Sequence, residues 1–343
     1  MSGEPFVRLV LSTMLVALST SLASADVFNM PSGLTSLEFV PVGNPGNKAS
    51  STGNGAVAKA YAIGKYEVTA GQYTQFLNSK AATDVYGLYS ASMSDPATQF
   101  VWGCNIQRSG SPGSYSYSVA SDWADRPVNY VSFWDACRFV NWLGNGQGDG
   151  DTETGAYSLN GYSGVDGRTI TTNVGARFWI PTKDEWYKAA YYKGGGSNAG
   201  YWQYAAASDN IPSWGLPPGI SNSANYKYGD NMVDLVHHTT EVGAYTSSPS
   251  PYGTFDQGGN VSEWNATIVA DSTSRRGRGG AFDDNFSPLG SYGAGWAGTP
   301  NYEYFSIGFR VAGVVPEPCS MVLTVTAAIS LLAYIWRPRK RKS

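Results

Sequence analysis

The chain has 343 residues with a formal net charge of −3, and only 14% of its residues are charged. Its 41 glycines, 13 Phe, 11 Trp and 23 Tyr are many for a chain of this length. This composition excludes a helical bundle and indicates a loop-rich globule that is packed by aromatic rings. No stretch outside the last seven residues is basic enough for a nucleic-acid surface, so nucleic acid is not expected as a partner.

The N-terminus predicts export. Residues 6–22 form an apolar run, and Ala23-Ser24-Ala25 follows it as a small-residue cleavage signal. Together these features predict a secretory signal peptide over residues 1–25. A buried helix is the alternative interpretation of the same run.

The body begins with two predicted strands and a helix. Residues 37–42 alternate between apolar and other side chains, which is typical of a strand, and residues 56–66 predict a second one. Thr69 and Gln72 form a capping box that predicts the start of a helix. Residues 84–123 are irregular and rich in aromatic side chains, and they predict no regular element.

Two more helices are predicted by the same capping chemistry. Ser132 with Asp135 starts a helix that runs to about residue 143, and Thr182 with Glu185 starts another. The acidic turn at residues 145–151 lacks the spacing of a calcium-binding helix–loop–helix motif, so a solvated loop is expected there. Residues 194–257 show no helix signal, and so long a loop needs packed aromatic rings or bound divalent ions to fix it.

The three cysteines are Cys104, Cys137 and Cys319. Cys319 lies in the C-terminal tail, so the body can form at most one disulfide, between Cys104 and Cys137. Sequence alone leaves that pairing open, because it gives no distance between the two residues. A metal site built on thiolates is excluded by their number.

The C-terminus predicts attachment to a membrane. Pro316-Glu317-Pro318 precedes an apolar run over residues 321–336, a little short of the ~20 residues that span a bilayer upright, and then a basic cluster. Residues 315–343 resemble the PEP-CTERM sorting signal of bacteria, which implies an exosortase-type membrane protease as a partner. A plain transmembrane anchor is the alternative. Either reading places the body in the cell envelope or the extracellular matrix.

Four ordered blocks of the body carry a family resemblance. Residues 259–264 read G-N-V-S-E-W, and R-G-G at 278–280 and G-F-R at 308–310 follow. Upstream lie YEVTAGQYTQFL at 66–77, RPVNYVSFWDACRFVNWL at 126–143 and RFWIPTKDEWYKAA at 177–190. In this order the blocks resemble the sulfatase-modifying factor family, whose founding members are the formylglycine-generating enzymes. The resemblance implies an α+β, C-type-lectin-like fold over residues 26–314, loop-rich with few short helices and strands.

The resemblance implies two calcium sites, each built from side-chain and backbone oxygens. The first maps to Asp256, Gly259, Val261 and Glu263. The second maps to Asn225, Tyr226, Asp234 and Val236. Calcium prefers such mixed sets of carboxylate and carbonyl oxygens. The alternative is that Asp256 and Glu263 only hydrogen-bond loop amides.

The family's oxidases hold a copper ion with two cysteines between the R-G-G and G-F-R blocks. Ser287 and Tyr292 occupy those positions here, and no cysteine lies between Cys137 and Cys319. Oxygen ligands cannot replace thiolates for Cu(I). We therefore expect neither copper nor catalytic residues, and no formylglycine-generating activity. An atypical oxidoreductase that acts on a sulfatase cysteine is the alternative.

Further side chains in this region suggest binding instead. Ser287, Tyr292, Trp296 and Tyr302 fall in the segment that lines the oxidases' substrate groove, and such a groove suits a peptide or polysaccharide ligand. An aromatic core would have the same composition. His237 and His238 are adjacent and lack a third histidine, so an iron site is not expected. Arg278 and Arg310 are expected to bond loop carbonyls or a carboxylate, with an anion clamp as the alternative.

Overall fold

The structure is a computed structural model that describes residues 26–27, 35–270 and 272–315. The predicted signal peptide, the apolar run at 321–336 and Cys319 lie outside the described residues. Within the described ranges, no helix is both long enough and apolar enough to cross a membrane.

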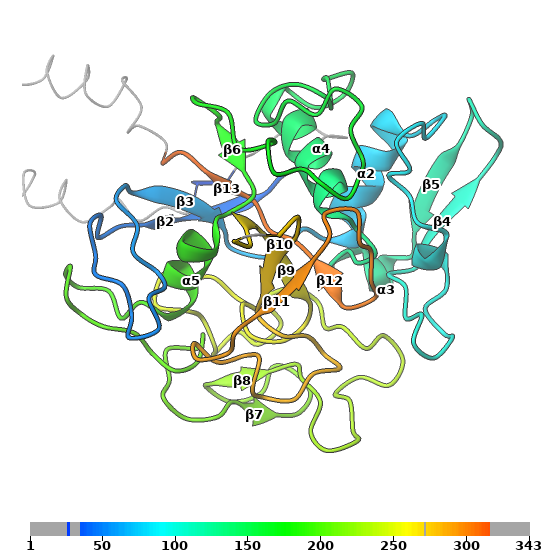
Figure 1. Ribbon diagram of the computed structural model, residues 1–343. Coiled ribbons are helices and arrows are strands. Elements are labelled where there is room, and N and C mark those ends of the chain that lie inside the picture. Colours follow the sequence, from blue (N-terminus) through cyan, green and yellow to red (C-terminus); the bar gives the residue numbers. More distant parts are fainter. Residues whose placement is uncertain (1–25, 28–34, 271, 316–343) are drawn as a thin grey trace, which may run out of the picture.

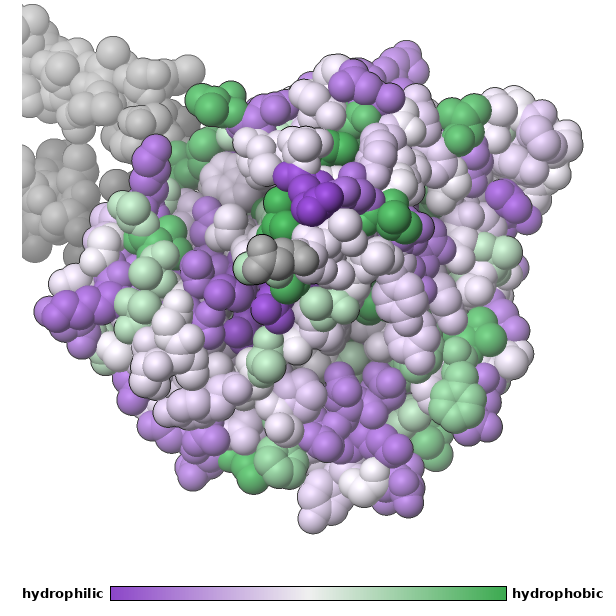
Figure 2. All heavy atoms as spheres, viewed as in Figure 1, coloured by the Kyte–Doolittle hydropathy of each residue, from purple (hydrophilic) through white to green (hydrophobic). Residues whose placement is uncertain are grey.

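Two small sheets form the centre of the molecule (Figure 1). On the face seen from the same direction in Figure 2, hydrophilic and hydrophobic residues are interspersed. The first has the order β1-β2-β3-β13-β6 and is antiparallel throughout. The second has the order β11-β10-β9-β12, in which β12 pairs with β9 in parallel. The strands are β1 (Asp26–Val27), β2 (Glu38–Val42), β3 (Tyr61–Gly64), β6 (Phe178–Trp179), β9 (Ser262–Ile268), β10 (Arg275–Arg278), β11 (Trp296–Gly298), β12 (Ile307–Gly308) and β13 (Ala312–Gly313). Such short strands, joined by long loops, confirm the loop-rich α+β prediction.

The three predicted helices are present, and each begins where its capping box predicts. They are α2 (Ala70–Lys80), α4 (Phe133–Gly144) and α5 (Lys183–Tyr191). In each, the cap side chain accepts from the backbone N–H three residues on, whose own side chain bonds back to the cap. A short α3 (Ser121–Ala124) adds one further turn.

Aromatic rings join α2, α4 and the C-terminal strands into the main core. The ring of Phe76 lies 5.5 Å from that of Phe139 and 5.2 Å from that of Trp142, measured between centroids. Phe139 in turn packs edge-on against Phe309 at 5.4 Å. These offset and edge-on contacts are the favoured geometries for aromatic pairs. The helices are therefore fixed by ring packing, because most helical stability in proteins comes from tertiary contacts.

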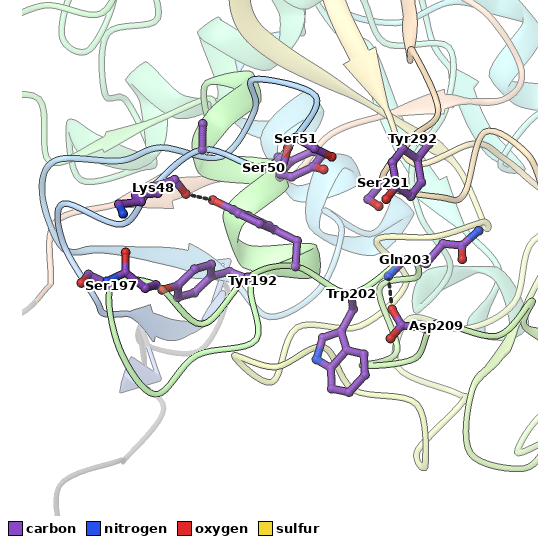
Figure 3. A pocket seen from close by; sticks show the side chains of 15 residues that line it. Lys48, Ser50, Ser51, Tyr192, Ser197, Trp202, Gln203, Asp209, Ser291 and Tyr292 are labelled. Atoms are coloured by element: carbon purple, nitrogen blue, oxygen red, sulfur yellow. Dashed lines mark hydrogen bonds between the residues drawn. The ribbon is translucent and has the colours of Figure 1, made fainter.

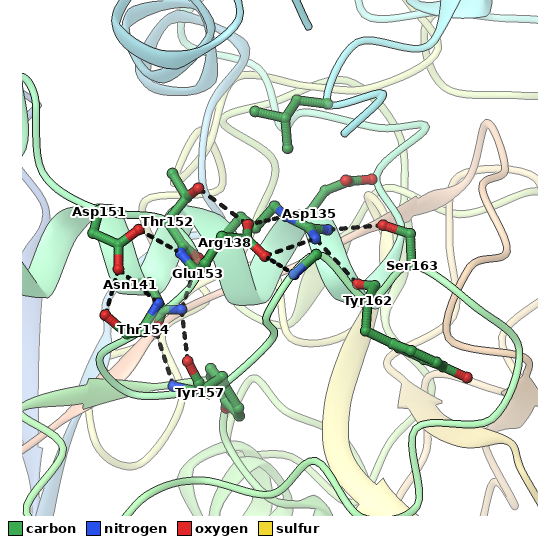
Figure 4. Close-up of polar contacts among 12 residues, drawn as sticks. Asp135, Arg138, Asn141, Asp151, Thr152, Glu153, Thr154, Tyr157, Tyr162 and Ser163 are labelled. Carbon is green, nitrogen blue, oxygen red and sulfur yellow. Dashed lines mark hydrogen bonds and ion pairs between the residues drawn. The ribbon is translucent and has the colours of Figure 1, made fainter. Parts of the chain in front are cut away.

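Every residue from Phe133 to Leu143 of α4 is buried, so its polar side chains need partners inside the protein. Figure 4 shows how the loop over residues 151–163 supplies them. Arg138 donates to Glu153 at 2.7 Å and to the Tyr162 carbonyl at 3.1 Å. Asn141 donates to two loop carbonyls and accepts from the Tyr157 N–H. The long connection after α4 is thus held by the buried polar face of that helix.

Two predictions about regular structure are corrected: that residues 84–123 form no element, and that residues 56–66 form one strand. Residues 84–123 contain a 3-10 turn (Ala91–Ser94) and a hairpin of β4 (Ile106–Ser109) and β5 (Ser116–Val119). Of β4 only its first residue is buried, so its sequence lacks the apolar alternation that identifies a strand. The strand predicted at 56–66 shrinks to β3. Residues 194–257 hold no helix, as expected, and form only β7 (Ser213–Trp214) and β8 (Ser223–Ala224).

The structure answers the question about the cysteines that the sequence leaves open. Cys104 and Cys137 are both free and both buried, so no disulfide joins them. Burial raises the pKa of the Cys104 thiol to about 11 and raises that of Cys137 well above its usual value. Both thiols therefore stay protonated and act as small core side chains.

A fully buried ion pair connects the two sheets. Arg310, between β12 and β13, donates to both carboxylate oxygens of Glu263 on β9, each at 2.6 Å. The same guanidinium donates to the carbonyls of Gly64, at the end of β3, and of Phe255. Burial lowers the Arg310 pKa, but the carboxyl groups of Glu263, Glu67 and Asp256 outweigh it and raise that pKa above its ordinary value.

We expect Arg310→Met to destabilise the protein more than Glu263→Gln. The first change leaves three buried carboxyl groups without their cation, and breaking a buried pair in this way costs about 3–5 kcal/mol. The second leaves the guanidinium beside two remaining carboxyl groups, and we expect a loss of about 1–3 kcal/mol. Urea unfolding of both variants beside wild type measures the two losses. Equal losses, or a larger loss for Glu263→Gln, would contradict this account.

Candidate functional site

The first mapped calcium set surrounds the ion pair, and its strongest ligand is already engaged. Both oxygens of Glu263 accept from Arg310, and one of them also accepts from the Trp186 indole N–H at 2.7 Å. The Gly259 backbone has a φ of +98°, and a Cβ there would lie 2.2 Å from the Asn225 carbonyl oxygen. The buried backbone at Val261 donates its N–H to Glu67. As arranged here, both oxygens of Glu263 are engaged, and three hydrogen bonds compete with a calcium ion for this carboxylate.

Asp256 and Glu67 complete a buried acidic cluster with Glu263. Asp256 accepts from the Gly243 N–H at 2.6 Å, and burial, more than the neighbouring Glu263, raises its pKa to about 6. Glu67 accepts from the Asn260 side chain at 2.9 Å, and burial followed by the charges of Asp256 and Glu263 raises its pKa well above normal. Glu67 was not predicted from the sequence. Its one signal was its place in the 66–77 block, two residues before the cap of α2, Thr69.

In the second mapped set the oxygen atoms are only partly available. Asp234 accepts from the backbone N–H groups of Val236 and His237, and its other oxygen lies 2.9 Å from the His237 ring nitrogen Nδ1. The Val236 side chain is exposed, while Tyr226 is buried and donates its hydroxyl to a loop carbonyl. Asn225 differs, because its Oδ1 is buried and has no hydrogen-bond partner.

Across the described part of the chain, no three His, Cys, Asp or Glu side chains are grouped closely enough to hold a metal ion. Of the side-chain oxygens in the mapped sets, Asn225 Oδ1 is a buried acceptor that lacks a partner. The first set is poorly suited to calcium as it stands, because Arg310 already pairs with Glu263. Calcium at both sets stays a prediction.

The four residues mapped to a ligand groove do not line one cleft. Trp296 and Tyr302 lie side by side at Gly298, where an added Cβ would be 2.9 and 3.5 Å from their rings. Trp296 packs edge-on against the buried Trp264, with ring centroids 4.5 Å apart. Tyr302 stacks on Tyr304 at 5.6 Å. Ser287 is exposed, and its backbone N–H bonds to the Asn285 side chain. Tyr292 alone of the four lines the cleft described next.

That cleft, which we call the Tyr292 cleft, is an open hollow of about 570 Å³ (Figure 3). Its walls come from the loop after β2, from the segment that follows α5, and from the loop before β11. Its lining consists of Lys48, Ala49, Ser50, Ser51, Tyr187, Tyr192, Ser197, Asn198, Gly200, Tyr201, Trp202, Gln203, Asp209, Ser291 and Tyr292. Its size is typical of a small-ligand site.

The base of the cleft is a packed row of tyrosines. The rings of Tyr187 and Tyr192 lie 5.3 and 5.1 Å from that of Tyr201, between centroids. The Asn47 side chain donates to the Tyr201 hydroxyl at 2.7 Å, which also bonds the Lys48 and Gly55 carbonyls. A Cβ at Gly55, where φ is +89°, would lie 2.7 Å from two of these rings. The base therefore fixes two loops against each other, although they are far apart in sequence.

The residues that line this cleft include neither the cysteines that would hold copper nor the histidines that would hold iron. None of its lining residues is a cysteine, and the two described cysteines are buried in the helical core. His237 bonds Asp234 and packs against Trp123, whereas His238 is buried against Trp102. The two histidines thus face different surroundings, as expected for adjacent residues.

The free energy of unfolding should increase as the pH falls from about 7 to about 5. Asp256 has a pKa of about 6 in the folded protein, and that of Glu67 is raised, whereas unfolded carboxyl groups titrate near 4. The folded state therefore binds more protons than the unfolded state in this window. The resulting stabilisation is full below about pH 4 and is lost as the pH rises through about 6.

Thermal melting across this range measures the effect, and Glu67→Gln is its control. The variant removes one titrating group, so its melting temperature should vary less with pH than that of wild type. Burial lowers the pKa of His238, so this residue alone would make the protein less stable as the pH falls. It is one group against several carboxyl groups, whose effect is the larger. A wild-type melting temperature that falls steadily from pH 7 to pH 5 would refute the assignment.

Comparisons with known proteins agree with this fold. The profile of the sulfatase-modifying factor enzyme 1-like domain matches residues 33–314. The crystal structure of CarF is similar at 23% identity, with a TM-score of 0.50, over 82% of this chain and 99% of that one. Treponema denticola variable protein 1 is similar at 19% identity, with a TM-score of 0.52, over 85% of this chain and 100% of that one. The search of curated proteins returned no match. Since the profile covers most of its length, the chain belongs to the sulfatase-modifying factor family.

Proposed function

We propose that this protein is an exported binding domain of its family that has no formylglycine-generating oxidase activity. The observation that carries the proposal is the Tyr292 cleft. At a position where the resemblance expects a copper-binding cysteine, the chain has a tyrosine whose side chain is 68% exposed and lines an open hollow. An aromatic ring held in solvent beside a cleft suits contact with a ligand.

The state of the cysteines supports the same conclusion. Copper-dependent oxidation needs thiolates that are accessible to metal and substrate. Cys104 and Cys137 are buried in the core, and burial raises the pKa of both thiols, which disfavours the thiolate. Cys319 belongs to the predicted sorting signal.

The ends of the chain supply the proposed location. The signal peptide over residues 1–25 directs export, and the Pro316-Glu317-Pro318 signal presents the protein to an exosortase-type protease. Until that step, the apolar run at 321–336 anchors the protein in the membrane. The ligand, a peptide or a polysaccharide, is then met in the envelope or the extracellular matrix.

An oxidase assay tests the proposal. Purified full-length protein is incubated with copper, oxygen, a thiol reductant and a cysteine peptide of the sulfatase type, beside an authentic formylglycine-generating enzyme. We expect the peptide mass to change with the authentic enzyme and to stay unchanged with this protein, because no thiolate pair is available. Formation of the aldehyde product by this protein would overturn the proposal in favour of an atypical oxidoreductase.

Calcium has its own test, centred on Asn225. An ion that binds only the folded chain stabilises it, by about 2.7 kcal/mol at a hundredfold excess over its Kd. We expect a higher melting temperature in millimolar calcium chloride than in chelator. We expect a larger difference for Asn225→Asp, which offers a carboxylate at the unpartnered position. Identical melting temperatures in calcium and chelator would count against both mapped sites.

A further inference from the structure

We propose that the ligand of the Tyr292 cleft is an uncharged polysaccharide chain. The inference rests on the proposed binding function and adds the chemical class of the ligand. It is drawn from the residues that line the cleft, from the way their backbone is held, and from their charge.

The lining matches the two-sided chemistry of a sugar ring. A hexose presents a face of C–H groups, which packs on aromatic rings, and an edge of hydroxyls, which exchange hydrogen bonds with amides and hydroxyls. The cleft offers both kinds of group. Its accessible rings are Tyr201, Trp202 and Tyr292, and its polar side chains include Ser50, Ser51, Ser197, Asn198, Gln203 and Ser291.

The lining fits a peptide less well. No Leu, Ile, Val, Met or Phe is among its 15 residues, so it lacks the aliphatic pockets that accept apolar side chains of a bound peptide. Its walls are loops, and its one helical residue, Tyr187, belongs to α5. The one extended pairing among the lining residues is the isolated bridge between Tyr192 and Tyr201, which is too short to offer an extended peptide a strand edge.

The binding rings stand on fixed backbone. The Ser291 N–H donates to the Gln203 carbonyl at 2.8 Å, which ties the loop that carries Tyr292 to the segment that follows α5. The Trp202 N–H donates to the Tyr191 carbonyl at 2.7 Å, at the end of α5. A site held in this way loses little conformational entropy when a ligand binds. The side chain of Tyr292 is nevertheless exposed, so the fold leaves its ring free for contact.

Charge at the cleft is balanced. Lys193 lies over the Trp202 ring at 4.2 Å from the centroid and pairs with Asp209 at 3.6 Å. Asp209 also accepts from the Gln203 N–H, so its carboxylate is already paired. Lys48 is the one cation among the lining residues, which is too little positive charge to select a polyanion. A neutral chain fits this balance.

Affinity electrophoresis tests the inference with the full-length protein in mild detergent. Native gels are cast with soluble neutral polysaccharides (a β-glucan, a dextran and a galactomannan) or with anionic alginate. We expect at least one neutral polymer to retard wild type more strongly than alginate does. Tyr292→Ala and Trp202→Ala should each weaken that binding roughly tenfold, as expected for the loss of one central aromatic contact.

Tyr228→Ala is the matched control, because Tyr228 is also an exposed tyrosine but does not line the cleft. It should bind as wild type does. Tyr292 is exposed, so its variant is expected to keep the wild-type melting temperature even if Trp202→Ala is destabilised.

Two results would overturn the inference: no retardation by any neutral polymer, or retardation that both cleft variants retain. Binding of a peptide library that Tyr292→Ala abolishes would also overturn it, while leaving the proposed binding function in place. Product in the oxidase assay would instead remove the proposed function itself.

Discussion

The bidentate contact between Glu263 and Arg310 is the interaction on which the rest of the structure depends. Neither sheet has strands long enough to form an independent core, and the connections between them are long. One guanidinium uses its donors on a β9 carboxylate, on the end of β3 and on the loop at Phe255, and so joins three segments at one point. A planar group with a fixed fork of donors suits this task better than an ammonium. The G-N-V-S-E-W and G-F-R blocks that identify the family contain the two halves of this contact.

Local chemistry explains which parts of the fold could be predicted from the sequence. A capping box acts within four residues, so all three main helices and their first residues could be derived from the chain alone. The β4–β5 hairpin could not, because β4 has a single buried residue and β5, although it alternates, is only four residues long. The core cysteines were ambiguous for a related reason: a free buried thiol and a disulfide use the same residue type.

The candidate site was less accessible to sequence reasoning, because its contacts are long-range. Glu67 bonds Asn260, 193 residues away, and Asn47 bonds Tyr201, 154 residues away. Neither separation leaves a periodic signal. The family resemblance mapped Tyr292 to a ligand groove, and Tyr292 lines a cleft, but the resemblance grouped it with Trp296 and Tyr302, which do not. No sequence motif marked Trp202 or the serines that line the cleft.

The buried, unpaired thiols bear on how the chain must mature if it is exported as we propose. Outside the cytoplasm an exposed cysteine meets oxidants, and an unfolded chain with Cys104 and Cys137 accessible is open to cross-linking that the native core does not contain. Once α4 and its neighbours pack, both sulfurs are sealed from solvent. Folding on the far side of the membrane therefore has to be faster than oxidation of the two thiols. Once the aromatic core has packed around them, they are protected from oxidants.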